Sequence, residues 1–305
     1  MTDKLYAWID GRVSSQEVAL FNLRLGAFHY GLAAFEGILA VRARGKGRNG
    51  VALFRAPEHI ARLLESAQAL HLDVRYSPQD ILEAIREIVI RNGSRTCYVR
   101  PLLFGGNDYL HLARKNMPAS LAVMVRPFNF LAFSLKMKIP VSLTTFGGRD
   151  NPSAGALGSL KVSGRYAMNM LAKRYALDRG CADAVLFDSS GSVAEATSSN
   201  IFIICKNKIS TPAPGKIIDG ITRKTVISIL EQMGLKVAVR VIGREELLES
   251  DAIFLTGTAS GIVCARNIEG HKLNAAAFVP AKLRSRYIDI ISGRDDKNSS
   301  YLNYC

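Results

Sequence analysis

The sequence predicts an α+β fold built in two domains. Short alternating or apolar segments bounded by glycines predict strands, and segments with apolar residues along one face predict helices. The chain has 305 residues, enough for two domains that each bury a core. We expect a smaller N-terminal domain at 1–125, an aromatic-rich interdomain segment at 126–136, a larger C-terminal domain at 137–292 and a polar tail at 293–305.

The N-terminal domain should combine antiparallel strands with two helices. Alternating segments within residues 5–55 predict strands, and the glycine-spaced basic run Arg42–Arg48 predicts a hairpin loop. Apolar residues on one face predict a helix over 56–70. A second helix should span 77–93, because Ser-Pro at its start and Gly at its end are typical helix boundaries. Further strands are expected at 96–104 and 119–128.

The C-terminal domain should alternate strands and helices. Helices are predicted over 163–180 and 220–234, each closed by a glycine, and a last helix near 278–291. Strands are expected at 138–146, within 183–211, at 237–242 and at 252–263. The tail is polar, and we expect it to be loosely ordered.

The net charge is the one unusual bulk property. It is +14, whereas 48% hydrophobic and 22% charged residues are ordinary for a globular protein. A basic balance can indicate nucleic acid, an anionic membrane surface or acidic small molecules. The only dense basic run, Arg42–Arg48, lacks the interleaved aromatic residues of nucleic-acid modules. We therefore expect no nucleic-acid partner.

Targeting and cysteine patterns indicate the compartment. No stretch approaches the roughly 18 apolar residues of a membrane span, and residues 1–10 lack a signal-peptide pattern. The five cysteines are scattered without metal-like spacing. We expect a reduced, cytoplasmic protein without a metal site and without a membrane partner.

Several side chains could carry chemistry. In GSLKVSGRY (158–166), Lys161 is either a surface charge or a nucleophile for Schiff-base chemistry. Glu195, among small residues, could face water or pair with a pyridinium nitrogen. The helix start at 220–222 and the small-residue turn at 255–261 could bind phosphate or be ordinary caps. Arg62 could join a phosphate site or be a solvated helix residue.

A resemblance covers residues from about 6 to about 270. The chain resembles the fold-type IV (class IV) aminotransferases that use pyridoxal phosphate, most of all branched-chain amino-acid aminotransferases. The resemblance implies a smaller N-terminal α/β domain and a larger C-terminal pseudo-barrel domain, with the cofactor between them. The matching motifs are FHYGLAAFEGI (28–38), FRAPEHIARL (54–63), YVRPLLF (98–104), LKVSGRY (160–166), EATSSNIF (195–202), DGITRK (219–224) and GTAS (257–260).

The resemblance implies a role for each matching residue. Lys161 would form the Schiff base with pyridoxal phosphate and move the substrate's α-proton. Tyr166 would hydrogen-bond the phenolic oxygen of the cofactor, and Glu195 would hold its pyridine nitrogen. The phosphate would be bound by Arg62, the backbone of Ile221, Thr222 and Thr258. The substrate α-carboxylate would be bound by Tyr98 and by the backbone of Thr258 and Ala259.

The resemblance also implies the substrate pocket and its surroundings. Arg100 would receive the side-chain carboxylate of glutamate, the usual amino donor. Phe128 and Phe130 would cover the site as a lid. The side-chain pocket would be lined by Tyr30, which would reach across a dimer interface, Phe35 and Gly37.

The implied activity is transfer of the amino group of Leu, Ile or Val to 2-oxoglutarate in branched-chain amino-acid biosynthesis, by a homodimer or higher homo-oligomer. The sequence departs from the family pattern at several positions. Arg165 replaces the usual asparagine, and Gly261 and Cys264 stand where Glu and Pro are common. EATSSN lacks the glycine usual after the glutamate, as in the D-amino-acid branch, and the lid has no tryptophan, the sole one being Trp8. The substrate therefore stays open. The alternatives are a D-amino-acid or (R)-amine transaminase, an aminodeoxychorismate lyase, a secondary-metabolism aminotransferase, or an inactive basic binding protein.

Overall fold

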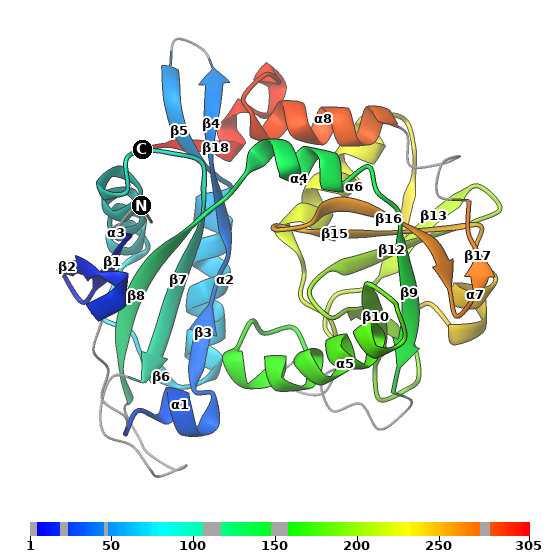
Figure 1. Ribbon diagram of the computed structural model, residues 1–305, viewed down its shortest axis with the longest axis horizontal. Helices are drawn as coiled ribbons and strands as arrows, with labels where there is room; N and C mark the ends of the chain where they lie inside the picture. Colours follow the sequence, from blue (N-terminus) through cyan, green and yellow to red (C-terminus); the bar gives the residue numbers. More distant parts are fainter. Residues whose placement is uncertain (1–4, 19–23, 46–47, 106–116, 148–157, 275–280) are drawn as a thin grey trace. The chain divides into compact units, whose positions relative to one another are not determined.

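The structure is a computed structural model that describes residues 5–18, 24–45, 48–105, 117–147, 158–274 and 281–305 (Figure 1). The chain divides into two units. The first contains residues 1–130, 160–164 and 289–305, and the second contains residues 131–159 and 165–288. These limits differ from the expected domains, since the Lys161 segment and the C-terminal residues pack with the first unit.

In the part of the chain that the structure describes, the first unit is a nine-stranded sheet with two long helices. Its elements are β1 (Tyr6–Ile9), β2 (Arg12–Ser15), η1 (Gln16–Val18), α1 (Gly26–Tyr30), β3 (Ala33–Phe35), β4 (Ile38–Gly45), β5 (Arg48–Phe54), α2 (Ala56–Ala69), β6 (Leu72–Asp73), α3 (Pro78–Arg91), β7 (Cys97–Gly105), β8 (Met117–Pro127), η4 (Asp296–Tyr301) and β18 (Leu302–Tyr304). The strand order is β18-β5-β4-β7-β8-β1-β2, while β3 pairs with β7 and β6 with β8.

The two helices form the core of this unit with the sheet. The apolar faces of α2 and α3 bury Ile60, Leu63, Ile81 and Ile85 against strand residues such as Val99. The sequence periodicity predicts both helices, and both are confirmed. The start of α3 follows from a capping box, in which Ser77 Oγ accepts from the Asp80 N–H (3.2 Å) and Asp80 Oδ2 accepts from the Ser77 N–H (2.8 Å).

The basic run lies on the predicted hairpin. Strands β4 and β5 pair antiparallel from Ala40 opposite Leu53 to Gly45 opposite Arg48. Arg42 and Arg44 are exposed on β4, so their charges point to solvent. The antiparallel hairpin is confirmed, but residues 42–45 and Arg48 belong to its strands and not to a loop, and the tip at 46–47 lies outside the described residues.

The C-terminal tail corrects the expectation of loose order. Strand β18 pairs antiparallel with β5, with Leu302 opposite Phe54. Leu302 is buried, and the Tyr301 ring packs edge-on against Phe54, with the Arg55 guanidinium 4.5 Å from its centroid. The tail is ordered because it supplies a strand to the edge of β5 together with an aromatic anchor.

The second unit is a mixed sheet with helices around it. Its elements are α4 (Phe130–Lys136), β9 (Val141–Phe146), η3 (Ser163–Arg165), α5 (Tyr166–Asp178), β10 (Asp183–Phe187), β11 (Val193–Ala196), β12 (Asn200–Cys205), β13 (Lys208–Pro212), α6 (Ile221–Gln232), β14 (Val237–Arg240), α7 (Arg244–Leu248), β15 (Ala252–Gly257), β16 (Gly261–Ile268), β17 (His271–Lys272) and α8 (Ala281–Ile291). Phe130 at the start of α4 and residues 289–291 at the end of α8 belong to the first unit.

The sheet of the second unit curls around an apolar core (Figure 1). Its strand order is β11-β10-β9-β16-β15-β12-β13-β14, with β17 paired to β16. Pairs β9–β10, β9–β16 and β13–β14 are parallel, and the other neighbours are antiparallel. The core contains Leu143, Val185, Ile203 and Ile253. Two units of mixed strands and helices confirm the predicted α+β class.

The aromatic segment at 126–136 consists of the end of β8 and the short helix α4. Phe128 and Phe130 are half-buried at this junction. Among the helices of the described residues, none is long and apolar enough to cross a membrane.

Replacing Gly293 should test how firmly the C-terminal segment docks. Gly293 has φ +73°, and an added Cβ would lie 2.3 Å from the carbonyl oxygen of Arg44. Gly293→Ala should therefore lower the free energy of unfolding by about 2 kcal/mol, through backbone strain and this clash. Urea unfolding followed by circular dichroism would measure the change.

Gly50→Ala is the control. Gly50 lies on β5 of the hairpin that Gly293 contacts at Arg44, and an added Cβ there meets nothing within 4 Å. It should change the free energy of unfolding by less than about 0.5 kcal/mol. Equal effects of the two substitutions would contradict a tight contact between Gly293 and β4.

Candidate active site

Lys161 is built into the first unit rather than placed on a loop tip. Its backbone N–H donates to Ser66 Oγ on α2 (3.1 Å), and its carbonyl accepts from the Phe35 N–H (3.1 Å). The next residue, Val162, forms a bridge with Ala34. The half-buried side chain places Nζ 5.0 Å from the centroid of the Phe35 ring. The lysine is therefore held from both sides, with its amine beside an aromatic face.

Three predicted substrate residues share this neighbourhood. The Arg100 guanidinium lies 4.5 Å from the Phe35 centroid, and its Nη2 donates to Tyr98 Oη (3.2 Å). A Cβ on Gly37 would lie only 1.8 Å from Tyr98 Oη, so glycine is required for the tyrosine to occupy this position. Arg100 Nε is buried and has no hydrogen-bond partner among the described residues. It is a donor that an anionic ligand could satisfy.

Tyr30 lies at the end of α1, close to the same chain segment. The Gly164 N–H donates to the Gly31 carbonyl (3.2 Å), and an added Cβ on Gly164 would lie 3.5 Å from the Tyr30 carbonyl. The Tyr30 side chain itself is 44% exposed. The structure thus places Tyr30 beside the Lys161 segment, with its ring accessible.

A buried ionic cluster anchors Arg62, and sequence reasoning missed two of its members. Glu36 is fully buried between Phe35 and Gly37. Arg62 Nε donates to Glu36 Oε1 (2.6 Å) and Nη2 donates to Oε2 (3.0 Å). His59 Nδ1, which must carry the proton because a carboxylate only accepts, donates to Oε2 (2.7 Å). The missed signal was a glutamate in an apolar strand, followed by a histidine and an arginine on one helix face.

The charges of this cluster fix its protonation. Burial by itself raises the pKa of Glu36, but Arg62 and His59, by charge and hydrogen bond, hold that pKa well below its usual value. Burial lowers the pKa of His59, which Glu36 opposes and the cations Arg62 and Lys161 reinforce. Glu36 is therefore a carboxylate and His59 a neutral donor, so Glu36 and Arg62 form an ion pair without net charge.

In the second unit, Glu195 is buried and held at both oxygens. Its Oε1 forms an ion pair with Arg165, whose guanidinium is also buried. Its Oε2 accepts from Asn200 Nδ2 (3.2 Å) and from the Ile218 N–H (3.3 Å). A carboxylate with these partners is an oriented anion, not the water-facing strand residue of the alternative interpretation. Tyr166 directly follows Arg165, half-buried at the first position of α5.

Asn200 brings three of the predicted motifs together. Besides Glu195, its Nδ2 donates to the Ile218 carbonyl (2.7 Å), just before the start of α6. A Cβ on Gly220 would lie 1.9 Å from Asn200 Oδ1, so only glycine fits there. Asn200 also pairs with Thr256 in the β12–β15 ladder. The side chain of Asn200 thus contacts the glutamate and the segment before the helix, while its backbone lies opposite the strand that leads into the 257–261 turn.

The helix start and the turn have the features of an anion site. Gly220 precedes α6 and provides no side-chain cap, and Ile221 and Thr222 are buried in the first turn. Helix N-termini of this kind attract phosphate through their N–H groups and dipole. In the turn, a Cβ on Gly257 would lie 2.8 Å from Ser260 Oγ, while Thr258 is half-buried and Ala259 exposed. The donor set fits a phosphate group.

Comparisons with known proteins agree with this geometry. Residues 33–268 match the family model Amino-transferase class IV. A branched-chain-amino-acid aminotransferase of Pseudomonas aeruginosa is 30% identical over 96% of this chain and 95% of its own length. The chain belongs to the class IV aminotransferase family.

Solved structures show the same fold. The branched-chain aminotransferase of Thermoproteus uzoniensis with norvaline is 30% identical, with a TM-score of 0.89 over 99% of both chains. The branched-chain amino acid aminotransferase of T.th. complexed with N-(5'-phosphopyridoxyl)-L-glutamate is 31% identical, with a TM-score of 0.89 over 100% of this chain and 99% of its own. The predicted family and the fold-type IV architecture are thereby confirmed.

One departure of this class IV aminotransferase from the family pattern has a packing reason. Gly261 has φ +65°, and an added Cβ would lie 2.3 Å from Met137 Sδ and 2.8 Å from the Phe133 ring. Phe133 and Met137 are both buried on or just after α4. Gly261 therefore allows α4 to pack against the end of the 257–261 turn.

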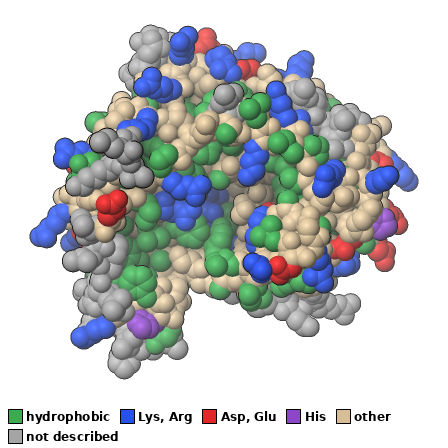
Figure 2. All heavy atoms as spheres, in the orientation of Figure 1, with side chains coloured by type: hydrophobic (Ala, Val, Ile, Leu, Met, Phe, Trp, Pro, Cys, Tyr) green, Lys and Arg blue, Asp and Glu red, His purple; other side chains and the backbone are tan. Residues whose placement is uncertain are grey.

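The basic side chains are not confined to one patch. They form separate groups among hydrophobic and uncharged side chains over the face shown in Figure 2. Within the first unit, however, Lys161 and Arg100 both lie over the Phe35 ring, and Arg62 pairs with the adjoining Glu36. The candidate site of the aminotransferase is thus locally cationic, which favours anionic substrates.

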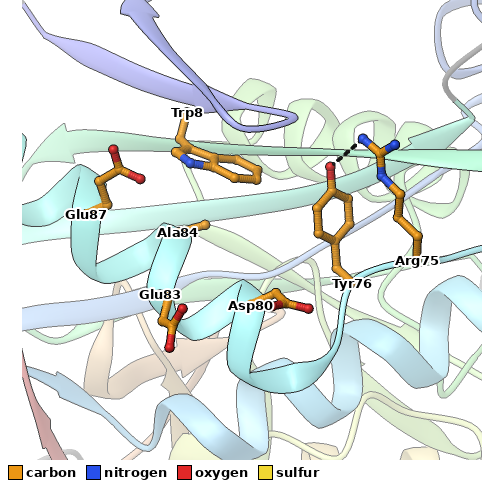
Figure 3. A pocket seen from close by; sticks show the side chains of 7 residues that line it. All are labelled: Trp8, Arg75, Tyr76, Asp80, Glu83, Ala84 and Glu87. Atoms are coloured by element: carbon orange, nitrogen blue, oxygen red, sulfur yellow. Dashed lines mark hydrogen bonds between the residues drawn. The ribbon is translucent and has the colours of Figure 1, made fainter.

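A pocket of about 560 Å³ lies on the first unit (Figure 3). It contains none of the residues predicted for lysine or phosphate chemistry, and its carboxylates disfavour an anionic substrate. Arg75 Nη2 donates to Tyr76 Oη there (2.9 Å). The pocket is lined by Trp8, Arg75, Tyr76, Asp80, Glu83, Ala84 and Glu87. It is therefore not the candidate site.

Removing the Glu36 charge should destabilise the enzyme in a pH-dependent way. Glu36→Gln leaves the Arg62 charge without its carboxylate, which should cost about 3 kcal/mol at pH 7. Because the folded-state pKa of Glu36 is lowered, its stabilisation is present above the ordinary carboxyl pKa and is lost as the pH falls below it. The difference between variant and wild type should shrink by about 2 kcal/mol near pH 3.

Urea unfolding at both pH values would measure this difference. The control is Glu58→Gln, which removes a more exposed carboxylate paired with Arg55 and should cost less than about 1 kcal/mol. A Glu36→Gln penalty that does not change with pH would contradict the ionised state of Glu36.

Proposed function

We propose that this class IV aminotransferase transfers the amino group of branched-chain L-amino acids to 2-oxoglutarate with pyridoxal phosphate as cofactor. The single observation that carries the proposal is that Lys161 and Arg100 lie over the same aromatic ring, Phe35. A lysine amine is the group that Schiff-base chemistry needs. An arginine beside it, in contact with Phe35 and Tyr98, suits an enzyme that accepts an aliphatic and an acidic side chain in turn.

The donor set of the second unit fits the cofactor. We assign Glu195 to the ring nitrogen, Tyr166 to the phenolic oxygen, and Ile221, Thr222 and Thr258 to the phosphate. The glycines at 220 and 257 leave room where a Cβ would collide. We also assign Arg62 of the first unit to the phosphate, as a guanidinium donor that Glu36 orients. When bound, pyridoxal phosphate supplies a carbonyl that condenses with amines and a ring that accepts electron density.

The residues of the first unit orient the reacting groups. The hydrogen bonds at the backbone of Lys161 fix its position. Its Nζ can therefore remove the α-proton of the amino donor and, in the reverse half of the reaction, deliver a proton to the same carbon. Glu36 and His59 hold Arg62 in one orientation, because the buried carboxylate binds the guanidinium through both oxygens and His59 donates to one of them. Preorganised charge of this kind needs no rearrangement when the ligand binds.

Substrate selection follows from the Phe35 neighbourhood. Tyr30, Phe35 and Gly37 line the side-chain pocket, where an aliphatic group gains by leaving water. Arg100 binds the second carboxylate of glutamate or 2-oxoglutarate, which satisfies its buried Nε. Tyr98 and the backbone of Thr258 and Ala259 bind the α-carboxylate.

The proposal includes the assembly and the compartment. We place the enzyme in the cytoplasm, in keeping with its five free thiols, and as a homodimer in which the exposed Tyr30 meets the second subunit. Phe128 and Phe130, at the junction of β8 and α4, serve as the cover of the site.

Lys161→Ala should abolish covalent attachment of the cofactor. Wild-type apoprotein mixed with pyridoxal phosphate should develop a visible absorption band, and borohydride should fix the label on the peptide that contains Lys161. Absorption spectra and peptide mass mapping would detect both. Lys173→Ala is the control and should keep the band. Lys173 lies on α5 with its side chain 40% exposed, and it pairs with Asp183 of β10 (3.3 Å). Labelling at another lysine in wild type would contradict the assignment.

Arg100→Met should separate the two substrates. Loss of charged hydrogen bonds should slow bleaching of the band by L-glutamate about 100-fold at low substrate concentration, and bleaching by L-leucine only a few-fold. Arg126→Met is the control, since Arg126 is exposed on β8 opposite Tyr98. Stopped-flow absorbance gives both rates.

An equal loss for L-glutamate and L-leucine would show that Arg100 is structural rather than selective. Bleaching of the wild-type band by D-alanine, with no response to L-leucine, L-isoleucine or L-valine, would contradict the branched-chain assignment. A chain that never develops the band would contradict the enzyme function itself.

A further inference from the structure

The ion pair between Arg165 and Glu195 is the feature that the function above leaves unused. Both side chains are buried, with 5% and 4% of the residue exposed. The pair joins the residue before α5 to strand β11. Burying two charges is costly unless they are paired closely, so the contact is a fixed part of this unit and not a chance surface pair.

Three donors to the Glu195 carboxylate come from its own unit. Arg165 binds Oε1, while Asn200 Nδ2 and the Ile218 N–H donate to Oε2. Of these three donors, only Arg165 carries a formal charge. A carboxylate can accept about four hydrogen bonds, so a ring N–H could join this set and would then share the carboxylate with a guanidinium.

Charged groups on neighbouring elements are paired with one another. Lys173 on α5 pairs with Asp183 on β10 (3.3 Å), and Arg223 on α6 pairs with Asp219 (2.9 Å). Within the second unit, Arg165 is a cation in direct contact with Glu195. An opposite charge at contact distance commonly changes a proton equilibrium by about tenfold or more.

We propose that Arg165 is a positioning residue that shares Glu195 with the cofactor's ring nitrogen and so lowers the proton affinity of that nitrogen. The inference rests on the proposed function, because it takes Glu195 as the partner of the ring. The guanidinium keeps Glu195 ionised and in place, but it also draws the carboxylate's negative charge toward itself. The ring nitrogen therefore interacts with a partly neutralised carboxylate instead of a full negative charge.

The test uses the protein loaded with ¹⁵N-labelled pyridoxal phosphate. The ¹⁵N chemical shift of the ring reports its protonation directly, independent of turnover. Arg165→Gln, which removes the charge and keeps hydrogen-bond donors, should move the shift toward the protonated reference, with at least about a tenfold change in the ratio of the two forms. Arg165→Lys, which keeps the charge, should stay near wild type. Arg165→Asn is the second charge-removing variant if Arg165→Gln does not fold.

Two comparisons show that the effect acts through Glu195. In a Glu195→Gln background, Arg165→Gln should cause no further change in the shift. Arg55→Asn is the matched control, since Arg55 is a buried arginine paired with Glu58 in the first unit. It should leave the shift unchanged, whereas a general loss of stability would affect both variants.

The outcomes separate this inference from the function beneath it. If wild type forms the visible band and the ¹⁵N shift is the same in wild type and Arg165→Gln, the inference is overturned and the function stands. Arg165→Lys and Arg165→Gln giving the same shift would also overturn it, because charge would then not matter. If wild type forms no band at all, the proposed function has failed.

Discussion

The side-chain amide of Asn200 is the contact on which the arrangement of the second unit depends. It donates to Glu195 and to the Ile218 carbonyl, and its oxygen excludes any side chain at position 220. The backbone of the same residue lies opposite Thr256 in the β12–β15 ladder, just before the 257–261 turn. An amide with one donor group and one acceptor group can satisfy several buried backbone and side-chain atoms at once. This makes three distant sequence segments into one polar cluster within an apolar unit.

In the first unit, a buried carboxylate and an aromatic ring stabilise three neighbouring cations. Lys161, Arg62 and Arg100 are near one another, and repulsion between them would be costly without a counterion. Glu36 is the buried carboxylate that binds Arg62, and His59 satisfies its second oxygen as a neutral donor. The other two cations lie on the face of Phe35, where the ring quadrupole attracts them. The cluster remains cationic, as a site for acidic substrates and a phosphate should be.

Much of the fold follows from the sequence, because local signals and packing agree. The capping box at Ser77, the glycine after α5 and the apolar faces of α2 and α3 each predict an element that the structure contains. The tail misled the prediction because η4 and β18 depend on pairing with β5, which lies about 250 residues away in sequence. A polar composition does not exclude a strand when a partner edge is available.

In the candidate site, too, some residues could be identified from the sequence and others could not. Lys161 and Glu195 could be identified because their motifs occur in a recognisable order, but Glu36, His59 and Asn200 could not, since each has meaning only through its contacts. A glutamate in an apolar strand indicates that a cation is nearby, but the sequence does not identify that cation. Contacts between distant segments were the missing information.

Two of the departures that the resemblance implies, Gly261 and Arg165, lie at contacts between distant segments. Gly261 permits Met137 and Phe133 to pack at the end of the 257–261 turn, and Arg165 brings a cation to Glu195. Neither substitution removes a donor assigned to the cofactor. Both alter a neighbour of an assigned group, one by shape and one by charge. Divergence of this kind can adjust substrate choice or the electronic character of the site while the binding of the cofactor is kept, because the residues that bind it are supported by separate hydrogen bonds.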